Sequence, residues 1–173
     1  MAPRNGPGRG FSAIELMVAT AVLAVLASLA IPTYVRLSRA ASLSAAANQM
    51  LWALHLARST SILRGEAVVV CLSADGGACL SAAAGGASGW LVFVDRDPAV
   101  PVRFDGEDEL LRHLSLPAGV SVRGTRAAVT FWPVAMAGTT GTFTFCAGAD
   151  GRAVVISQTG RPRVEKKNLS CAA

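Results

Sequence analysis

The chain has 173 residues and a formal net charge of +5, and 52% of its residues are hydrophobic although only 6% are aromatic. This length allows one modest domain with an appendage. Much of the hydrophobic excess lies in residues 16–31, a run without a single charge. The rest has the composition of an ordinary small globular domain.

An acid stands inside the apolar N-terminal segment. Glu15 is followed by an uncharged run that lasts until Arg36. A carboxylate near the end of a membrane-buried helix costs roughly 2–3 kcal/mol on insertion scales, so such a residue is usually there for a partner. Secretory signals also have a basic start and an apolar core, and residues 28–30 resemble their cleavage site. A periplasmic domain released by ordinary signal peptidase is therefore the alternative to an anchored chain.

Residues 10–16, G-F-S-A-I-E-L, resemble the class III signal of type IV pilins and pseudopilins, usually written G-F-T-L-I-E-L. The resemblance implies that a prepilin peptidase cleaves between Gly10 and Phe11, removes the leader 1–10 and methylates Phe11. It also implies that Glu15 pairs with the terminal amine of a neighbouring subunit, since two charges that are each costly in lipid are tolerated as a pair. The chain would then sit in the bacterial inner membrane, with its head in the periplasm, before it joins a filament.

One long helix is predicted from Phe11 to Arg64, where a glycine follows a basic residue. Its first part, residues 11–35, is long enough to form a transmembrane stem, and Pro32 should bend it without ending it. Its second part, residues 36–65, should pack on the head through apolar residues at three- and four-residue steps, namely Leu43, Ala47, Met50, Leu51, Leu54 and Ala57.

Residues 66–173 are predicted to form an antiparallel β-sheet head, so the fold class is α+β. Phe143 and Phe145 alternate with threonines, which places both rings on one face of a strand and the threonines on the other. Runs of β-branched or aromatic residues bounded by turn residues predict the strands, at 67–72, 90–94, 129–132, 142–146 and 153–157, with a further strand around His113.

The whole arrangement resembles the GspH/FimT family of minor pilins and pseudopilins. The likeness includes the anchor, the helix ending in L-A-R-S-T-S-I-L-R-G, the segment G-W-L-V-F-V-D and the C-terminal T-G-R-P-R. It implies assembly with other pilins in a type IV pilus or a type II secretion pseudopilus. Because the sequence has no catalytic signature, we expect that the chain is not an enzyme and holds no cofactor.

The four cysteines form no C-x-x-C pair and have no histidine at zinc spacing. Behind an export segment an even number of cysteines favours disulfides, and four cysteines permit three pairings. The local choice joins Cys71 to Cys79 and leaves Cys146 for Cys171.

Signatures of catalysis such as a Walker loop or H-E-x-x-H are missing from the sequence. His55 is expected to be half-buried against the head, and His113 to lie at the surface or at a sheet edge. Residues 95–109 contain six acids, which could hold calcium, but the spacing of an EF-hand loop is absent. We therefore expect a solvated loop there and no metal site.

Residues 110–173 contain eight bases and two acids. Arg161 and Arg163 flank a proline, and in an extended chain they point the same way. Their guanidinium groups suit a phosphate backbone, in a contact that ignores base sequence and weakens with salt. The segment resembles the G-R-x-R motif through which FimT-type minor pilins bind DNA during natural transformation, which implies double-stranded DNA as a partner. Lys166 and Lys167 join these candidates on charge alone.

Two other interpretations of this basic segment remain open. It can be a solvated strand end, or it can contact the acidic loop of a neighbouring subunit. In both cases the chain would be a purely structural type II secretion pseudopilin that touches no nucleic acid.

Overall fold

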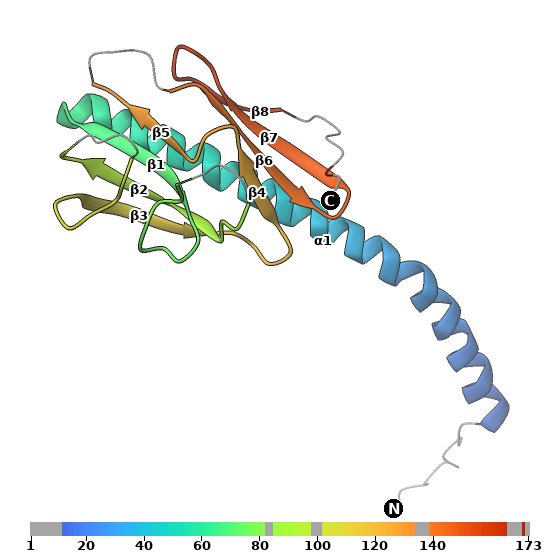
Figure 1. The fold of residues 1–173 in the computed structure, drawn as a ribbon. Helices are drawn as coiled ribbons and strands as arrows, with labels where there is room; N and C mark the ends of the chain where they lie inside the picture. The colour runs from blue at the N-terminus through green and yellow to red at the C-terminus, as the bar shows by residue number, and fades with distance from the viewer. Residues whose placement is uncertain (1–11, 82–84, 98–101, 134–138, 166–170, 172–173) are drawn as a thin grey trace, which may run out of the picture. The chain divides into compact units, whose positions relative to one another are not determined.

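The computed structural model describes residues 12–81, 85–97, 102–133, 139–165 and 171. The chain divides into two compact units, residues 1–38 and 39–173, called here the stem and the head. One helix, α1 (Ala13–Arg64), contributes to both units, and the strands follow it in the head (Figure 1).

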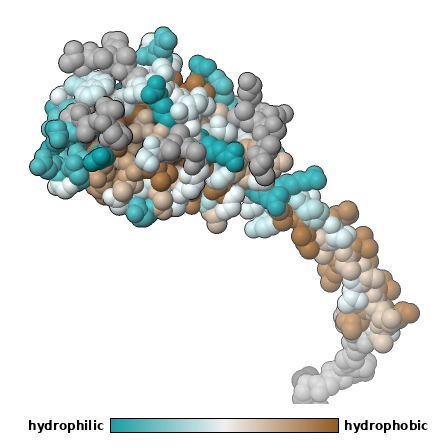
Figure 2. Space-filling model, viewed as in Figure 1, coloured by the Kyte–Doolittle hydropathy of each residue, from teal (hydrophilic) through white to brown (hydrophobic). Residues whose placement is uncertain are grey.

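The stem is an apolar helical segment. α1 begins after Ser12, whose carbonyl accepts hydrogen bonds from the N–H groups of Glu15 and Leu16. The large apolar side chains of the stem are exposed, as the brown surface of this segment in Figure 2 shows, and the helix is long and apolar enough to cross a membrane. Pro32 lies inside α1 without ending it, as predicted.

Gly65 ends α1, also as predicted. Its φ of 72° is a left-handed conformation that glycine adopts without strain, and its N–H donates to the carbonyl of Ser61 at 3.0 Å. One face of α1 is buried in the head, at Leu43, Ala46, Ala47, Met50, Ala53, Leu54, Ala57 and Ser61. Leu51, expected on this face, is only half-buried, because the contact is centred on Met50 and Ala57.

The predicted antiparallel strands are confirmed, and they are divided between two four-stranded sheets. The first sheet has the order β3-β2-β1-β5, formed by β3 (Glu109–Ser115), β2 (Gly89–Asp95), β1 (Ala67–Ser73) and β5 (Ala128–Phe131). The second has the order β4-β6-β7-β8, formed by β4 (Ser121–Gly124), β6 (Gly141–Ala147), β7 (Asp150–Ile156) and β8 (Pro162–Glu165).

Both sheets share one hydrophobic core with α1. Side chains of α1 pack there with apolar residues of both sheets, among them Trp90 and Phe131 of the first and Phe143 and Phe145 of the second. Trp90 and Phe145 meet edge to face, with ring centroids 6.0 Å apart. A second, smaller cluster covers the other face of the first sheet and comprises Val69, Cys71, Leu91 and Phe93, with Cys79, Val102, Phe104 and Ala128 packed against them.

Candidate functional site

The stem places its acid in the first turn of α1. Glu15 Oε2 lies 3.5 Å from the backbone nitrogen of Ser12. Ser12 and Glu15 thus have the spacing of a capping box, in which the glutamate satisfies a free N–H at the start of a helix. This local role is one that the sequence interpretation missed, although S-x-x-E is readable. The predicted cleavage and methylation positions, Gly10 and Phe11, lie outside the described residues.

The head places Arg161 and Arg163 at the hairpin between β7 and β8. The turn is closed by Ser157, whose N–H donates to the carbonyl of Arg161 at 3.2 Å and whose hydroxyl accepts from the Arg161 N–H at 3.2 Å. Pro162 between the two arginines is buried, while both arginines are exposed. The two guanidinium groups therefore lie on the same side of the strand, as the spacing predicted.

Arg163 already has an acidic neighbour within the chain. Its Nε and Nη2 lie 3.1 and 2.6 Å from the same carboxylate oxygen of Glu165, two residues further along β8. The side chain of Arg163 keeps 63% of its surface exposed in this pair. Because exposed ion pairs are weak, the pair orients Arg163 without occupying it permanently. Lys166 and Lys167 lie outside the described residues.

The second sheet has an outer face, turned away from α1. Val122, Phe143, Phe145, Val154 and Ile156 belong to the core. Residues that alternate with them along the strands point to the opposite side, and they include Arg123, Thr142, Thr144, Val155, Arg163 and Glu165.

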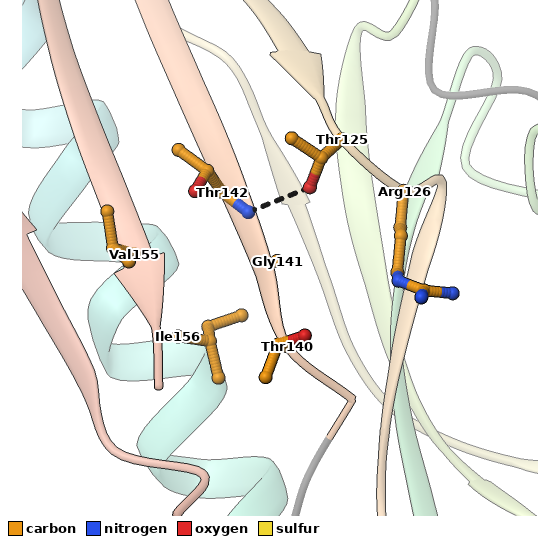
Figure 3. A pocket seen from close by; sticks show the side chains of 7 residues that line it. All are labelled: Thr125, Arg126, Thr140, Gly141, Thr142, Val155 and Ile156. Atoms are coloured by element: carbon orange, nitrogen blue, oxygen red, sulfur yellow. Dashed lines mark hydrogen bonds between the residues drawn. The ribbon is translucent and has the colours of Figure 1, made fainter. Parts of the chain in front are cut away.

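A hollow of about 470 Å³ opens at the end of the second sheet where β6 begins and β7 ends. Figure 3 shows Arg126 on one side of it, Val155 and Ile156 on the other, and the Thr142 N–H donating to the hydroxyl of Thr125 at 3.0 Å. The sequence interpretation did not single out Arg123 or Arg126, because the four-residue strand β4 was not predicted and shows too little periodicity to be recognised.

The acidic segment around residues 95–109 is used largely for internal contacts. Asp108 accepts from the backbone N–H groups of Arg96 and Asp105, at 3.2 and 3.0 Å. Glu109 accepts from Arg64 at 2.8 Å and lies 3.5 Å from Arg96. Within the described ranges, no group of three His, Cys, Asp or Glu side chains is arranged to hold a metal ion.

Asp95, at the end of β2, is only 6% exposed. Its burial, and secondarily the nearby charge of Asp108, raises the pKa of its carboxyl above the ordinary value. Asp75 is the opposite case, because the N–H groups of Gly77 and Ala78 donate to its carboxylate and lower its pKa.

Neither histidine has the setting of a catalytic base. His55 is exposed on α1, so the expectation of half-burial was wrong. It lies next to Leu54 in sequence, but on the side of the helix that faces away from the core. His113 is exposed on β3, the edge strand of the first sheet, as predicted.

The cysteines form two disulfides, and the pairs are those expected from the sequence. Cys71 is joined to Cys79, with Cα atoms 5.6 Å apart, and Cys146 to Cys171, with Cα atoms 5.8 Å apart. The second bridge closes a 25-residue separation and ties residue 171 to β6.

Comparisons with known proteins agree with this architecture. The family described as "Type II transport protein GspH" matches residues 46–160. Two structures of the type IV minor pilin FimU of Pseudomonas aeruginosa each have a TM-score of 0.54 and cover 75% of this chain. The first is 20% identical and is matched over 100% of the FimU chain, and the second is 22% identical and is matched over 95%. The minor pseudopilin EpsH of the Vibrio cholerae Type 2 Secretion System follows with a TM-score of 0.50, 13% identity and coverage of 72% of this chain and 97% of EpsH. No curated protein sequence matches significantly.

Proposed function

The chain belongs to the GspH family of type II transport proteins, and on this premise we propose that it is a minor pilin or pseudopilin matured and assembled through its N-terminal segment. Family membership makes it a structural subunit and not an enzyme. A prepilin peptidase cleaves between Gly10 and Phe11 and methylates Phe11. The chain then stays in the bacterial inner membrane, with its head in the periplasm, until it joins a pilus or pseudopilus.

The observation that carries this proposal is the junction of G-F-S-A-I-E-L with an exposed apolar helix. Mass spectrometry of the mature protein tests it. The N-terminus should be methylated Phe11. A mature chain beginning at Ile31 would instead identify ordinary signal peptidase as the processing enzyme and would remove the anchor.

Glu15 is proposed to pair with the terminal amine of a neighbouring subunit. Its contact with Ser12 requires a test that separates assembly from helix capping. Glu15→Ala removes both the charge and the acceptor, whereas Glu15→Gln keeps the acceptor and removes only the charge. Both variants should be lost from isolated filaments. If Glu15→Gln is incorporated normally, capping is the whole role of this residue.

The proposed role of the head is to receive DNA at the filament. Two observations support it: the motif G-R-P-R at residues 160–163, and the exposure of both arginines on one side of β8.

A binding titration tests this role. The full-length protein in nonionic detergent is titrated against a labelled duplex at low salt. Arg161→Ala/Arg163→Ala should weaken binding about tenfold or more, since each arginine neutralises phosphate.

Arg103→Ala/Arg112→Ala is the matched control, because it removes two exposed arginines from β3 and the segment before it. This variant should bind nearly as the wild type does. A wild-type protein that fails to bind duplex at low salt would remove the receptor role and leave a structural subunit.

A purely structural type II secretion pseudopilin is the second candidate. The ion pair between Arg163 and Glu165 favours it, since one of the two guanidinium groups already has an acidic partner within the chain. A deletion strain distinguishes the two. Loss of exported protein with intact DNA uptake supports the secretion role, and the reverse result supports the receptor.

A further inference from the structure

The outer face of the second sheet has arginines along both of its edges. Its strand order is β4-β6-β7-β8, so β4 and β8 are the two edge strands. β4 and the turn after it contribute Arg123 and Arg126, and the β8 side contributes Arg161 and Arg163. All four side chains are exposed.

The strand register places Arg123 and Arg163 on the same face, and Arg126 lines a hollow with Thr142 and Val155 of that face. Arg123 lies opposite Thr144 of β6, Thr144 opposite Ala153 of β7, and Ala153 opposite Glu165 of β8. The neighbouring row runs from Thr142 through Val155 to Arg163. Residues directly opposite each other in a sheet share a face, so Arg123 and Arg163 point to the same side.

The side chains between the two edges are short. Thr142, Thr144, Ala153 and Val155 occupy the middle strands of this face, and the Cys146–Cys171 bridge lies on the same face beyond Thr144. No long side chain among these four separates the arginines, and the threonine hydroxyls can donate hydrogen bonds. The hollow lined by Arg126 and Thr140 adds a depression at the end of the sheet where β7 ends (Figure 3). Arg161 lies at the same end, because Pro162, the next residue, is opposite Ile156. This surface can therefore accept a broad anionic partner.

The separation of the edges indicates what kind of anion fits. β4 and β8 are three strand spacings apart, which is roughly 14 Å. Phosphates along one DNA strand follow each other at a rise of about 3.4 Å, whereas the major groove between the two backbones is about 12 Å wide. Two rows of arginines at this distance match two backbones better than neighbouring phosphates of one strand.

We propose that the outer face of the second sheet grips duplex DNA by both backbones, with Arg123 and Arg126 holding one and Arg161 and Arg163 the other. This inference rests on the proposed receptor role and adds two contact residues and a preference for double strands. The contact reads no base sequence, because arginines on phosphates position a duplex without specifying it.

The experiment compares a duplex with a single strand of the same length, titrated with the full-length protein in nonionic detergent over a range of salt concentrations. Arg123→Ala/Arg126→Ala should weaken duplex binding about tenfold and make the slope of log K against log[salt] less steep by about 2. Its effect on single-strand binding should be much smaller. Arg123→Lys/Arg126→Lys keeps both charges and should retain most duplex binding, which also reports on the folding of β4.

Several results would overturn the proposal. The alanine pair could behave like Arg103→Ala/Arg112→Ala, or it could lower duplex and single-strand affinity equally. Polyglutamate could also bind as tightly as duplex at the same salt, which would indicate a face for acidic proteins. If Arg161→Ala/Arg163→Ala is the only variant that loses binding, this inference is overturned and the receptor role stands. A wild type that binds no DNA overturns both.

Glu165→Gln tests the same face in the opposite direction. Glu165 lies on the outer face of β8, where its carboxylate pairs with Arg163. Removing its charge frees the Arg163 guanidinium and should tighten duplex binding several-fold at low salt. Unchanged or weaker binding would contradict a backbone contact at this edge.

Discussion

The two sheets of the head have the same number of strands and the same antiparallel pairing, yet their outer faces differ. In the first sheet, β1 and β2 are buried at every position, because Phe104 and its neighbours cover Val69, Leu91 and Phe93. In the second sheet, β6 alternates between buried and half-buried residues. Threonines of β6 and arginines of the edge strands occupy the outer face of this sheet. The outer face of the first sheet thus contributes to stability, whereas that of the second carries the Cys146–Cys171 bridge at one end and exposed arginines at both edges.

The strongest test of this contrast is Phe93→Ala. Phe93 is fully buried, and its ring centroid lies 5.0 Å from that of Phe104. Removing it should lower the free energy of unfolding by about 3–5 kcal/mol, through lost burial and the remaining cavity. Urea denaturation followed by tryptophan fluorescence measures this in the full-length protein in micelles. Val155→Ala on the second sheet should cost about 1 kcal/mol at most. Equal losses would refute the contrast.

The disulfide of the second sheet should have the next largest effect. Cys146 lies opposite Ser121 on the outer face, and its bond to Cys171 closes a long loop that includes β8. Cys146→Ser/Cys171→Ser should lower the free energy of unfolding by roughly 3 kcal/mol, because the unfolded chain regains loop entropy. A non-reducing mass measurement of the wild type is the control. An unchanged denaturation midpoint would show that the tail adds nothing to this sheet.

Asp95 sharpens the comparison, because it places a carboxyl within the covered first sheet. Its pKa is raised in the folded state by burial, so the protonated acid is favoured there. Stability from this residue is present at acidic pH and is lost as pH rises through the raised pKa. Asp95→Asn should therefore gain up to about 1 kcal/mol at pH 7 and nothing at pH 3.

Thermal melting of Asp95→Asn across this pH range measures the effect. Asp75→Asn is the control of opposite sign. The pKa of Asp75 is lowered by the N–H groups of Gly77 and Ala78, so its stabilisation is present at neutral pH and is lost as pH falls below the ordinary carboxyl value. A gain at pH 7 in both variants would contradict the assignment.

The smallest expected effect belongs to Thr144→Val, in the middle of the open outer face. Thr144 is half-buried and lies opposite Arg123 and Ala153. A β-branched replacement keeps the strand preference, so unfolding should change by no more than about 0.5 kcal/mol. A loss of more than about 1 kcal/mol in the same urea measurement would show that this face is packed after all.

Local patterns were enough to predict much of this molecule. The helix ends at Arg64 because Gly65 supplies the left-handed residue that closes it, and both features are adjacent in the sequence. The alternation of Phe143 and Phe145 with threonines correctly predicted which side of β6 enters the core. The disulfide pairs also agree with the sequence expectation, since Cys71 and Cys79 are close in the chain.

Long-range pairing is what the sequence left undetermined. β4 has four residues, and its partner β6 begins 17 residues after it ends, so no local period predicts that Arg123 and Arg126 lie across the sheet from Arg161 and Arg163. The exposure of His55 likewise depends on which side of α1 meets the sheets. Sequence alone therefore determined the helix, most strands and the basic C-terminal segment. Only the tertiary structure decided that the strands form two sheets and that the outer face of one sheet has exposed arginines at both edges, because hydrogen bonds between strands join residues that are distant in the chain.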